Sequence, residues 1–196
     1  MTPLALLRHG PTPWNAERRL QGRADVALGE RARLALAQAR LPAQIAEFRC
    51  LVSPLVRCLE TARLLGCRAT IDPRLIEMDW GKFEGRSLDE LRRELGGALA
   101  ENEARGLDFT PPDGESPRAV QTRITPLLVE IAAARQATLA ITHRGVIRAI
   151  YARAVGWDMT GRPPHILDLY AIQLFALAPD GVPSIARLNL KLGAST

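Results

Sequence analysis

The chain has 196 residues, of which 47% are hydrophobic and 24% charged, and its formal net charge at pH 7 is +5. This length fits one domain with a single core over residues 1–196, and the composition excludes disordered and fibrous proteins. No apolar run reaches the ~18 residues that a membrane span needs, and Arg8 interrupts the N-terminal run too early for a signal peptide. We therefore expect a cytoplasmic protein with no membrane contact.

Arginine supplies the positive charge, since only Lys82 and Lys191 are lysines among 26 basic residues. The arginines are scattered and have no aromatic ladder beside them, so we expect no nucleic acid partner. A small anionic substrate explains the surplus at least as well. Three cysteines, Cys50, Cys58 and Cys67, lack metal-ligand spacing, which predicts reduced, buried thiols, no metal and no cofactor.

Strand-like apolar runs alternate with helical patterns along the chain. The expected strands are 3–8, 49–52, 69–72, 137–142, 171–177 and 184–190, and the expected helices are 30–47, 54–65, 87–105, 116–134 and 145–155. The stretch 106–117, with two glycines and three prolines, is predicted to be a loop over one end of the sheet. This order predicts an α/β fold, a three-layer α/β/α sandwich with a mainly parallel sheet, and the hairpin at "APDGVP" predicts one antiparallel edge strand.

The first strand ends in "LLRHGPTPWN", where Arg8 and His9 follow a buried apolar run. Two basic groups at a strand end need an anion or water. In "LVSPLVRCLETARLLG", Ser53 is a suitable N-cap and Pro54 a suitable first helical residue, which puts Arg57 near the first turn. The helix dipole disfavours a cation there, so Arg57 either extends into solvent or meets an anion at the helix N-terminus.

The stretch "ATLAITHRGVIRAIYARAVG" repeats this arrangement, with His143 between a strand end and a helix start. Ligands of open α/β sheets bind outside the carboxyl ends of the strands. Arg8, His9, Arg57 and His143 are therefore predicted to converge on one pocket. The remaining histidine, His165 in "RPPHIL", is interpreted as a loop residue.

A further motif, "RLIEMDWGKFEG", carries three carboxylates, Glu77, Asp79 and Glu84. One of them is a candidate general acid and base for a departing alcohol, and the alternative is a set of salt bridges to the pocket arginines. These arginine, histidine and carboxylate side chains are suited to phosphoryl transfer. Two guanidinium groups can hold the phosphoryl oxygens, a neutral imidazole can attack phosphorus to give a phosphohistidine, and arginine charge takes the place of a metal.

These motifs resemble those of the histidine phosphatase superfamily, in its phosphoglycerate mutase-like branch. "RHGPTPWN" looks like the RHGxT signature, and it is followed in family order by "QGRADVAL", "SPLVRCLETA", "LIEMDWGKFEG", "PDGES" and "THRGVIRA". The resemblance implies that His9 is the phosphorylated nucleophile, that Arg8, Arg57 and His143 complete the phosphate pocket, and that Glu77 is the proton donor.

The resemblance also implies supporting positions around the phosphate and the substrate. These are Thr12, Asn15, Gln21, Gly22 and Thr142, with Ser116 behind them. Three departures from the family stand out, one of which is that "DVALGERARLA" looks shorter than the family's corresponding stretch. Pro11 replaces the glutamate usual in mutases, and Arg144 replaces a small residue, adding a cation at the pocket rim or an outward salt bridge.

The expected function is a phosphoric monoester hydrolase that acts on a small phosphorylated substrate without a metal. A cofactor-dependent phosphoglycerate mutase is the alternative, and a catalytically silent binding protein of the same fold is a remote one. Mutases that resemble this family usually carry extra segments and a tail, whereas this chain has only "KLGAST" after its last strand and a modest helical insert at 87–105. The natural substrate and a homodimer through an edge strand or helix face both stay open.

Overall fold

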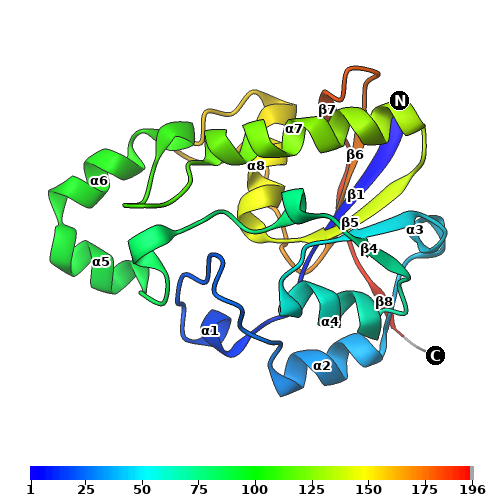
Figure 1. Ribbon diagram of the computed structural model, residues 1–196, viewed down its shortest axis with the longest axis horizontal. Coiled ribbons are helices and arrows are strands. Elements are labelled where there is room, and N and C mark those ends of the chain that lie inside the picture. Colours follow the sequence, from blue (N-terminus) through cyan, green and yellow to red (C-terminus); the bar gives the residue numbers. More distant parts are fainter. Residues whose placement is uncertain (195–196) are drawn as a thin grey trace.

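Six strands form the central sheet of the computed structural model, which describes residues 1–194 (Figure 1). They are β1 (Thr2–Arg8), β3 (Arg49–Val52), β4 (Ala69–Ile71), β5 (Thr138–Thr142), β6 (Ile172–Leu177) and β7 (Pro183–Leu190). Their order is β4-β3-β5-β1-β6-β7; the first four are parallel, and β6 is antiparallel to both neighbours. The predicted mainly parallel sheet with an antiparallel edge is confirmed. The antiparallel strand is β6, and β7 lies outside it.

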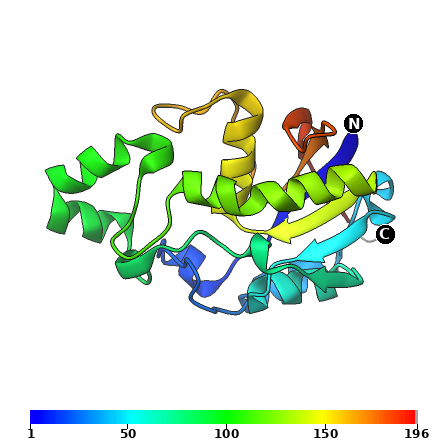
Figure 2. The same cartoon turned by 45° about the horizontal axis from the view of Figure 1, so that its top comes forward.

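Helices cover both faces of this sheet because side chains alternate along each strand. On β1, Leu4 and Leu6 pack into the core beneath α7 (Pro117–Ala134) and α8 (Arg144–Val155). Ala5 and Leu7 pack into the opposite core, beneath α2 (Glu30–Ala37) and α4 (Val56–Leu64). Figures 1 and 2 show these two helical layers on opposite sides of the sheet. The three-layer α/β/α prediction is therefore confirmed.

The remaining elements are short. They are α1 (Pro13–Ala16), α3 (Ala43–Ala46), α5 (Leu88–Leu95), α6 (Gly97–Glu103), the paired strands β2 (Ala39–Arg40) and β8 (Gly193–Ala194), and 3₁₀ helices at Pro73–Leu75, Gly81–Phe83 and Gly106–Asp108.

Two of the predicted long helices are divided, and one begins later than predicted. The 30–47 helix is interrupted by β2, and Pro42, which restricts the residue before it to extended conformations, precedes α3. The 87–105 helix breaks at Gly96, whose φ of 49° is not helical. The helix predicted from Pro54 starts at Val56, with Leu55 as its N-cap residue. Ser53 accepts the amide of Leu55 at 3.4 Å, ahead of the first helical residue, and its hydroxyl also lies 2.7 Å from Nε2 of His143.

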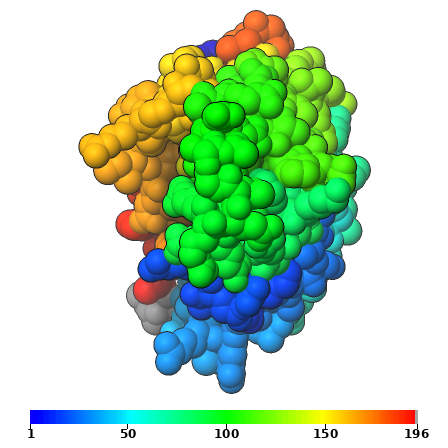
Figure 3. Space-filling model, turned by 90° about the vertical axis from the view of Figure 1, so that its left-hand side faces the viewer, coloured from blue at the N-terminus to red at the C-terminus, as the bar shows by residue number. Residues whose placement is uncertain are grey.

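The segment α5–α6 projects beyond the sheet and forms one wall of the main cleft of the molecule. It has a small core of its own, built from Phe83, Leu91 and Leu99. Figure 3 looks onto this end, where α5–α6 (green) lies between the N-terminal loop (blue) and the segment after α8 (orange). Within residues 1–194, no helix has the length and apolar character needed to cross a membrane.

Candidate active site

His9 stands directly after β1, and backbone bonds fix its position. Its amide donates to the carbonyl of Thr142 at 3.0 Å, which ties the end of β1 to the end of β5. Its Nδ1 lies 2.7 Å from the carbonyl oxygen of Gly10. A carbonyl only accepts, so we assign the ring proton to Nδ1 and the lone pair to Nε2.

The charge state of His9 follows from its surroundings. Burial lowers the pKa of His9 well below its ordinary value, and the positive charges of Arg8 and Arg57 lower it further. The ring is therefore neutral at pH 7. Its free Nε2 has the lone pair that a nucleophile requires.

Arg57 is fully buried near the start of α4. Its Nη1 donates to the carbonyl of Ala24 at 2.8 Å and its Nη2 to the carbonyl of Gly22 at 2.7 Å. Within residues 1–194, the buried Nε atoms of Arg57 and Arg8 have no hydrogen-bond partner. A buried donor on a cation costs free energy when it has no partner, so an anion bound beside these two Nε atoms would be stabilised. The alternative in which Arg57 extends into solvent is wrong.

Glu77 is also buried, and two backbone amides hold its carboxyl group. Met78 donates to Oε1 at 2.8 Å, and Gly145 donates to Oε1 and Oε2 at 3.1 and 3.2 Å. The pKa of Glu77 is raised because burial outweighs the opposing effects of these amides and of Arg57 and Arg8. A raised pKa lets a carboxyl group keep the proton that a leaving alcohol needs.

The other two candidate carboxylates have structural partners. Asp79 pairs with Arg23 at 3.2 Å, and Glu84 accepts the backbone amides of Arg23 and Ala24 at 2.6 and 3.1 Å. Neither lines the cleft. Asp79 therefore forms a salt bridge, and Glu84 holds the loop at Arg23 and Ala24. Of the three carboxylates, Glu77 is the one that lines the cleft.

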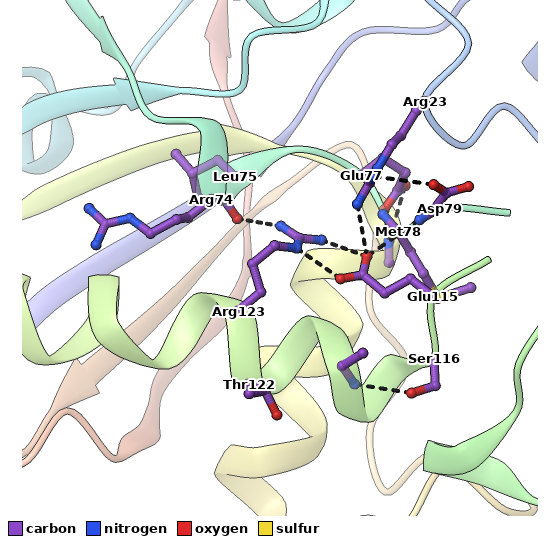
Figure 4. Close-up of polar contacts among 12 residues, drawn as sticks. Arg23, Arg74, Leu75, Glu77, Met78, Asp79, Glu115, Ser116, Thr122 and Arg123 are labelled. Carbon is purple, nitrogen blue, oxygen red and sulfur yellow. Dashed lines mark hydrogen bonds and ion pairs between the residues drawn. The ribbon is translucent and has the colours of Figure 1, made fainter. Parts of the chain in front are cut away.

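A half-buried ion pair clamps the segment that carries Glu77 (Figure 4). Arg123 on α7 binds Glu115 through two bonds of 2.9 Å and also donates to the carbonyl of Arg74. The Glu115 amide donates to the carbonyl of Asp79 at 2.9 Å. The clamp therefore grips the chain on both sides of Glu77. Nothing in the local sequence pattern marked Arg123, because its partners lie on other elements.

His143 lies behind His9 rather than on the cleft wall. The two ring centroids are 5.2 Å apart, and His143 is fully buried. The Ser53 hydroxyl lies 2.7 Å from Nε2 of His143 and accepts the Leu55 amide at 3.4 Å. The hydroxyl proton is thus free to donate to Nε2, and we assign the ring proton of His143 to Nδ1. Burial and the nearby His9 and Arg57 lower the pKa of His143, so this ring is neutral too.

Several predicted positions have structural contacts that shape the site, and two of them, Asn15 and Gly22, also line the cleft. Thr12 caps α1 in a reciprocal pair with Asn15, whose Oδ1 accepts the Thr12 amide at 3.0 Å. The Thr142 hydroxyl donates to the carbonyl of Leu75 at 2.7 Å. Ser116 caps α7. Gly22 has a φ of 52°, and a Cβ there would lie 1.9 Å from Glu84, so the loop that holds Arg57 requires glycine.

His9, Arg57 and Glu77 border one cleft of about 370 Å³, a size that suits a small-molecule ligand. Of the predicted site residues, the cleft is lined by Arg8, His9, Asn15, Gln21, Gly22, Arg57, Glu77 and Arg144, whereas Thr12, Thr142 and His143 do not line it. The buried Oε1 of Gln21 has no partner within the described chain, so it can accept a ligand donor. The cleft has further lining residues that the sequence reasoning did not single out, among them Trp80, Phe109, Arg148 and Met159. Only Arg148 carried a signal, its position one helical turn after Arg144.

No group of three or more histidine, cysteine or acidic side chains in residues 1–194 is arranged to hold a metal ion. The use or absence of a metal in the reaction stays a prediction.

Comparisons with known proteins bear on this site. A family model described as "Histidine phosphatase superfamily (branch 1)" matches residues 4–191. A curated protein named probable phosphoglycerate mutase GpmB, from Cronobacter sakazakii, is 38% identical over 131 residues, which cover 63% of this chain and 60% of that protein. The match thus spans about 60% of the length of such curated relatives.

Solved structures share the fold over nearly the whole chain. Bacillus stearothermophilus YhfR superposes with a TM-score of 0.80 at 27% identity and covers 98% of both chains. A phosphoserine phosphatase from Entamoeba histolytica, solved with 3-phosphoglyceric acid, gives a TM-score of 0.79 at 24% identity over 96% of this chain and 97% of that one. At that identity the second likeness shows the fold alone.

Proposed function

The chain belongs to branch 1 of the histidine phosphatase superfamily, and we propose that it is a metal-independent phosphatase that hydrolyses small phosphomonoesters through a phosphohistidine at His9. One observation carries the proposal. The free Nε2 of a neutral His9 lies with two arginine Nε donors that lack a partner within residues 1–194 and with a buried carboxyl group of raised pKa.

In the first step, Nε2 of His9 attacks phosphorus and the bond to the leaving oxygen breaks. Glu77 in its protonated form gives that oxygen its proton, so a neutral alcohol departs. Arg8 and Arg57 stabilise the charge that spreads over the phosphoryl oxygens. In the second step, water attacks phosphorus, the bond between phosphorus and Nε2 breaks, and Glu77 takes the proton of the water. Inorganic phosphate leaves, and both side chains return to their starting states.

Phosphoglycerate mutase is the second candidate, because the curated relatives carry that name. A mutase uses the same first step and returns the phosphoryl group to a second hydroxyl group instead of to water. Hydrolysis is favoured by the open cleft, whose lining includes the exposed side chains of Arg19 and Arg144. Water can therefore reach a phosphorylated His9.

Two assays test the proposal. The protein should release p-nitrophenol from p-nitrophenyl phosphate in excess EDTA, and His9→Ala should abolish this, whereas the control His165→Ala, at a loop histidine bonded to Tyr151, should not. With 3-phosphoglycerate, phosphorus NMR should show inorganic phosphate accumulating. Accumulation of 2-phosphoglycerate instead would favour the mutase, and no turnover of either compound would favour a binding protein.

A further inference from the structure

Two arginines of the cleft have no role in the proposed reaction. Arg144 and Arg148 lie on α8 and both line the cleft that contains His9. Residues four apart on a helix share one face, so the two guanidinium groups extend on the same side of α8. Both side chains also border a second, adjoining cavity of about 180 Å³, which places them where the two cavities meet.

Neither arginine is neutralised by the protein. Within residues 1–194, no carboxylate lies within 4.0 Å of either guanidinium group, and neither makes a side-chain hydrogen bond. The acidic residues of the cleft have other partners, since Glu77 binds backbone amides and Glu103 pairs with Arg92. Arg19, also in the cleft, pairs with Glu17.

Arg148 is held in place although it lacks an ionic partner. Its guanidinium lies over the ring of Trp157, 5.2 Å from the ring centroid. This contact makes no hydrogen bond, so the N–H donors of Arg148 have no protein partner within the described chain and are available to a ligand. Burial and the charge of Arg144 lower the pKa of Arg148 to about 10, so the group is still charged at pH 7. A charged, half-buried donor that is fixed from behind is suited to bind an anion.

The positions of Arg144 and Arg148 are electrostatically unfavourable without a bound anion. Arg144 is the first residue of α8, where the helix dipole repels a cation, and Arg148 adds a like charge one turn away. Arg8 and Arg57 already match a single phosphoryl group, so the pair on α8 provides charge for a second acidic group.

We propose that Arg144 and Arg148 form a second anion subsite, which binds a carboxylate or phosphate group carried by the same phosphomonoester whose phosphoryl group reacts with His9. The inference rests on the proposed function for the identity of the first group. Arg144 and Arg148 line the same cleft as His9, Arg8 and Arg57, and Gly145, the neighbour of Arg144, donates to Glu77. A compact substrate with acidic groups at both ends can therefore lie across both sites.

The test compares 3-phosphoglycerate with glycerol phosphate, in which a hydroxymethyl group replaces the carboxylate. The wild-type kcat/KM should favour 3-phosphoglycerate by about ten- to one-hundredfold, the value of a charge-assisted bond. In Arg144→Gln/Arg148→Gln this preference should fall to near one, while kcat/KM for glycerol phosphate changes about twofold or less. The control Arg31→Gln, an exposed arginine on α2, should keep the preference.

Equal kcat/KM values for the two substrates in the wild type, or an equal loss of both in the double variant, would overturn the subsite. If the protein turns over neither, the proposed reaction fails, and the same pair is compared by calorimetric titration. Tighter binding of 3-phosphoglycerate that the double variant loses then supports the subsite, and equal affinities overturn it. Arg148→Lys, which keeps the charge, should retain most of the preference even if the glutamine variant unfolds. Fructose 1,6-bisphosphate against fructose 6-phosphate gives the corresponding preference for a second phosphate group over a hydroxyl group, which can be compared with the preference for the carboxylate.

Discussion

The substitution Gly145→Ala tests the assignment of Glu77 as the proton donor. A Cβ at position 145 would lie 2.5 Å from Oε1 of Glu77, whereas ordinary contact begins at 3.4 Å, so the carboxyl group must move by the difference of about 0.9 Å. That movement breaks the bonds from the Gly145 amide to the carboxyl oxygens. Bonds to a charged group contribute about 1.5–3 kcal/mol each, which corresponds to roughly ten- to one-hundredfold in rate.

Stability should change far less than activity. Position 145 lies inside α8 without a positive φ, where alanine is favoured over glycine by about 0.5–1 kcal/mol. This gain offsets part of the strain. We therefore expect a Tm close to that of the wild type. The control Gly97→Ala, where a Cβ meets no atom within 4 Å, should change neither quantity.

The assay measures kcat with two leaving groups. An alkoxide needs a proton as it departs, whereas p-nitrophenolate hardly does, so Gly145→Ala should slow glycerol phosphate turnover ten- to one-hundredfold and p-nitrophenyl phosphate turnover much less. The double variant Gly145→Ala/Glu77→Gln should be no slower than Glu77→Gln alone. Equal losses with both leaving groups, or additive losses in the double variant, would refute the assignment.

Three further predictions follow from the buried contacts. Ser53→Ala removes the bond to Nε2 of His143 and should lower the free energy of unfolding by about 1–3 kcal/mol in urea denaturation; an unchanged midpoint would contradict that bond. Because the pKa of His9 is lowered, the acid limb of the kcat/KM profile should lie below pH 6.5, and because the pKa of Glu77 is raised, the basic limb should lie above pH 4.5. Glu77→Gln should abolish only the basic limb. Glu115→Gln loosens the clamp and should move the basic limb to lower pH. Glu77 binds its proton more tightly in the folded than in the unfolded protein, so its ionisation destabilises the fold as pH rises above 4.5. Glu77→Gln should therefore gain stability relative to the wild type over that pH range. A parallel pH dependence of the two Tm values would contradict this.

The N-terminus of α4 shows where local sequence reasoning stops. Ser53 and Pro54 form a good capping pattern, yet the helix begins at Val56. The Ser53 hydroxyl lies 2.7 Å from Nε2 of His143, which is 90 residues away in the chain, and it also accepts the amide of Leu55, the residue before the helix. The neighbouring residues give no sign of this distant partner, which the fold alone brings to Ser53.

The arginines show the same limit. The positions of Arg8 and His9 at a strand end could be interpreted from the sequence, because parallel strands must end at one edge of the sheet. That Arg123 clamps the Glu77 segment, and that Arg148 lines the cleft on the face of Trp157, depends on contacts between elements distant in sequence.

The sequence by itself determined the layered architecture and the location of the chemistry. Alternating apolar residues on β1 set two buried faces, and the strand-end motifs marked the edge of the sheet at which the cleft lies. Only the tertiary structure showed which carboxyl group is buried in the cleft with a raised pKa, which nitrogen of His9 is free and which arginines lack counter-charges. These properties depend on burial and on distances of a few ångströms, because desolvation and Coulomb energies follow the three-dimensional surroundings of a group rather than its neighbours in the chain.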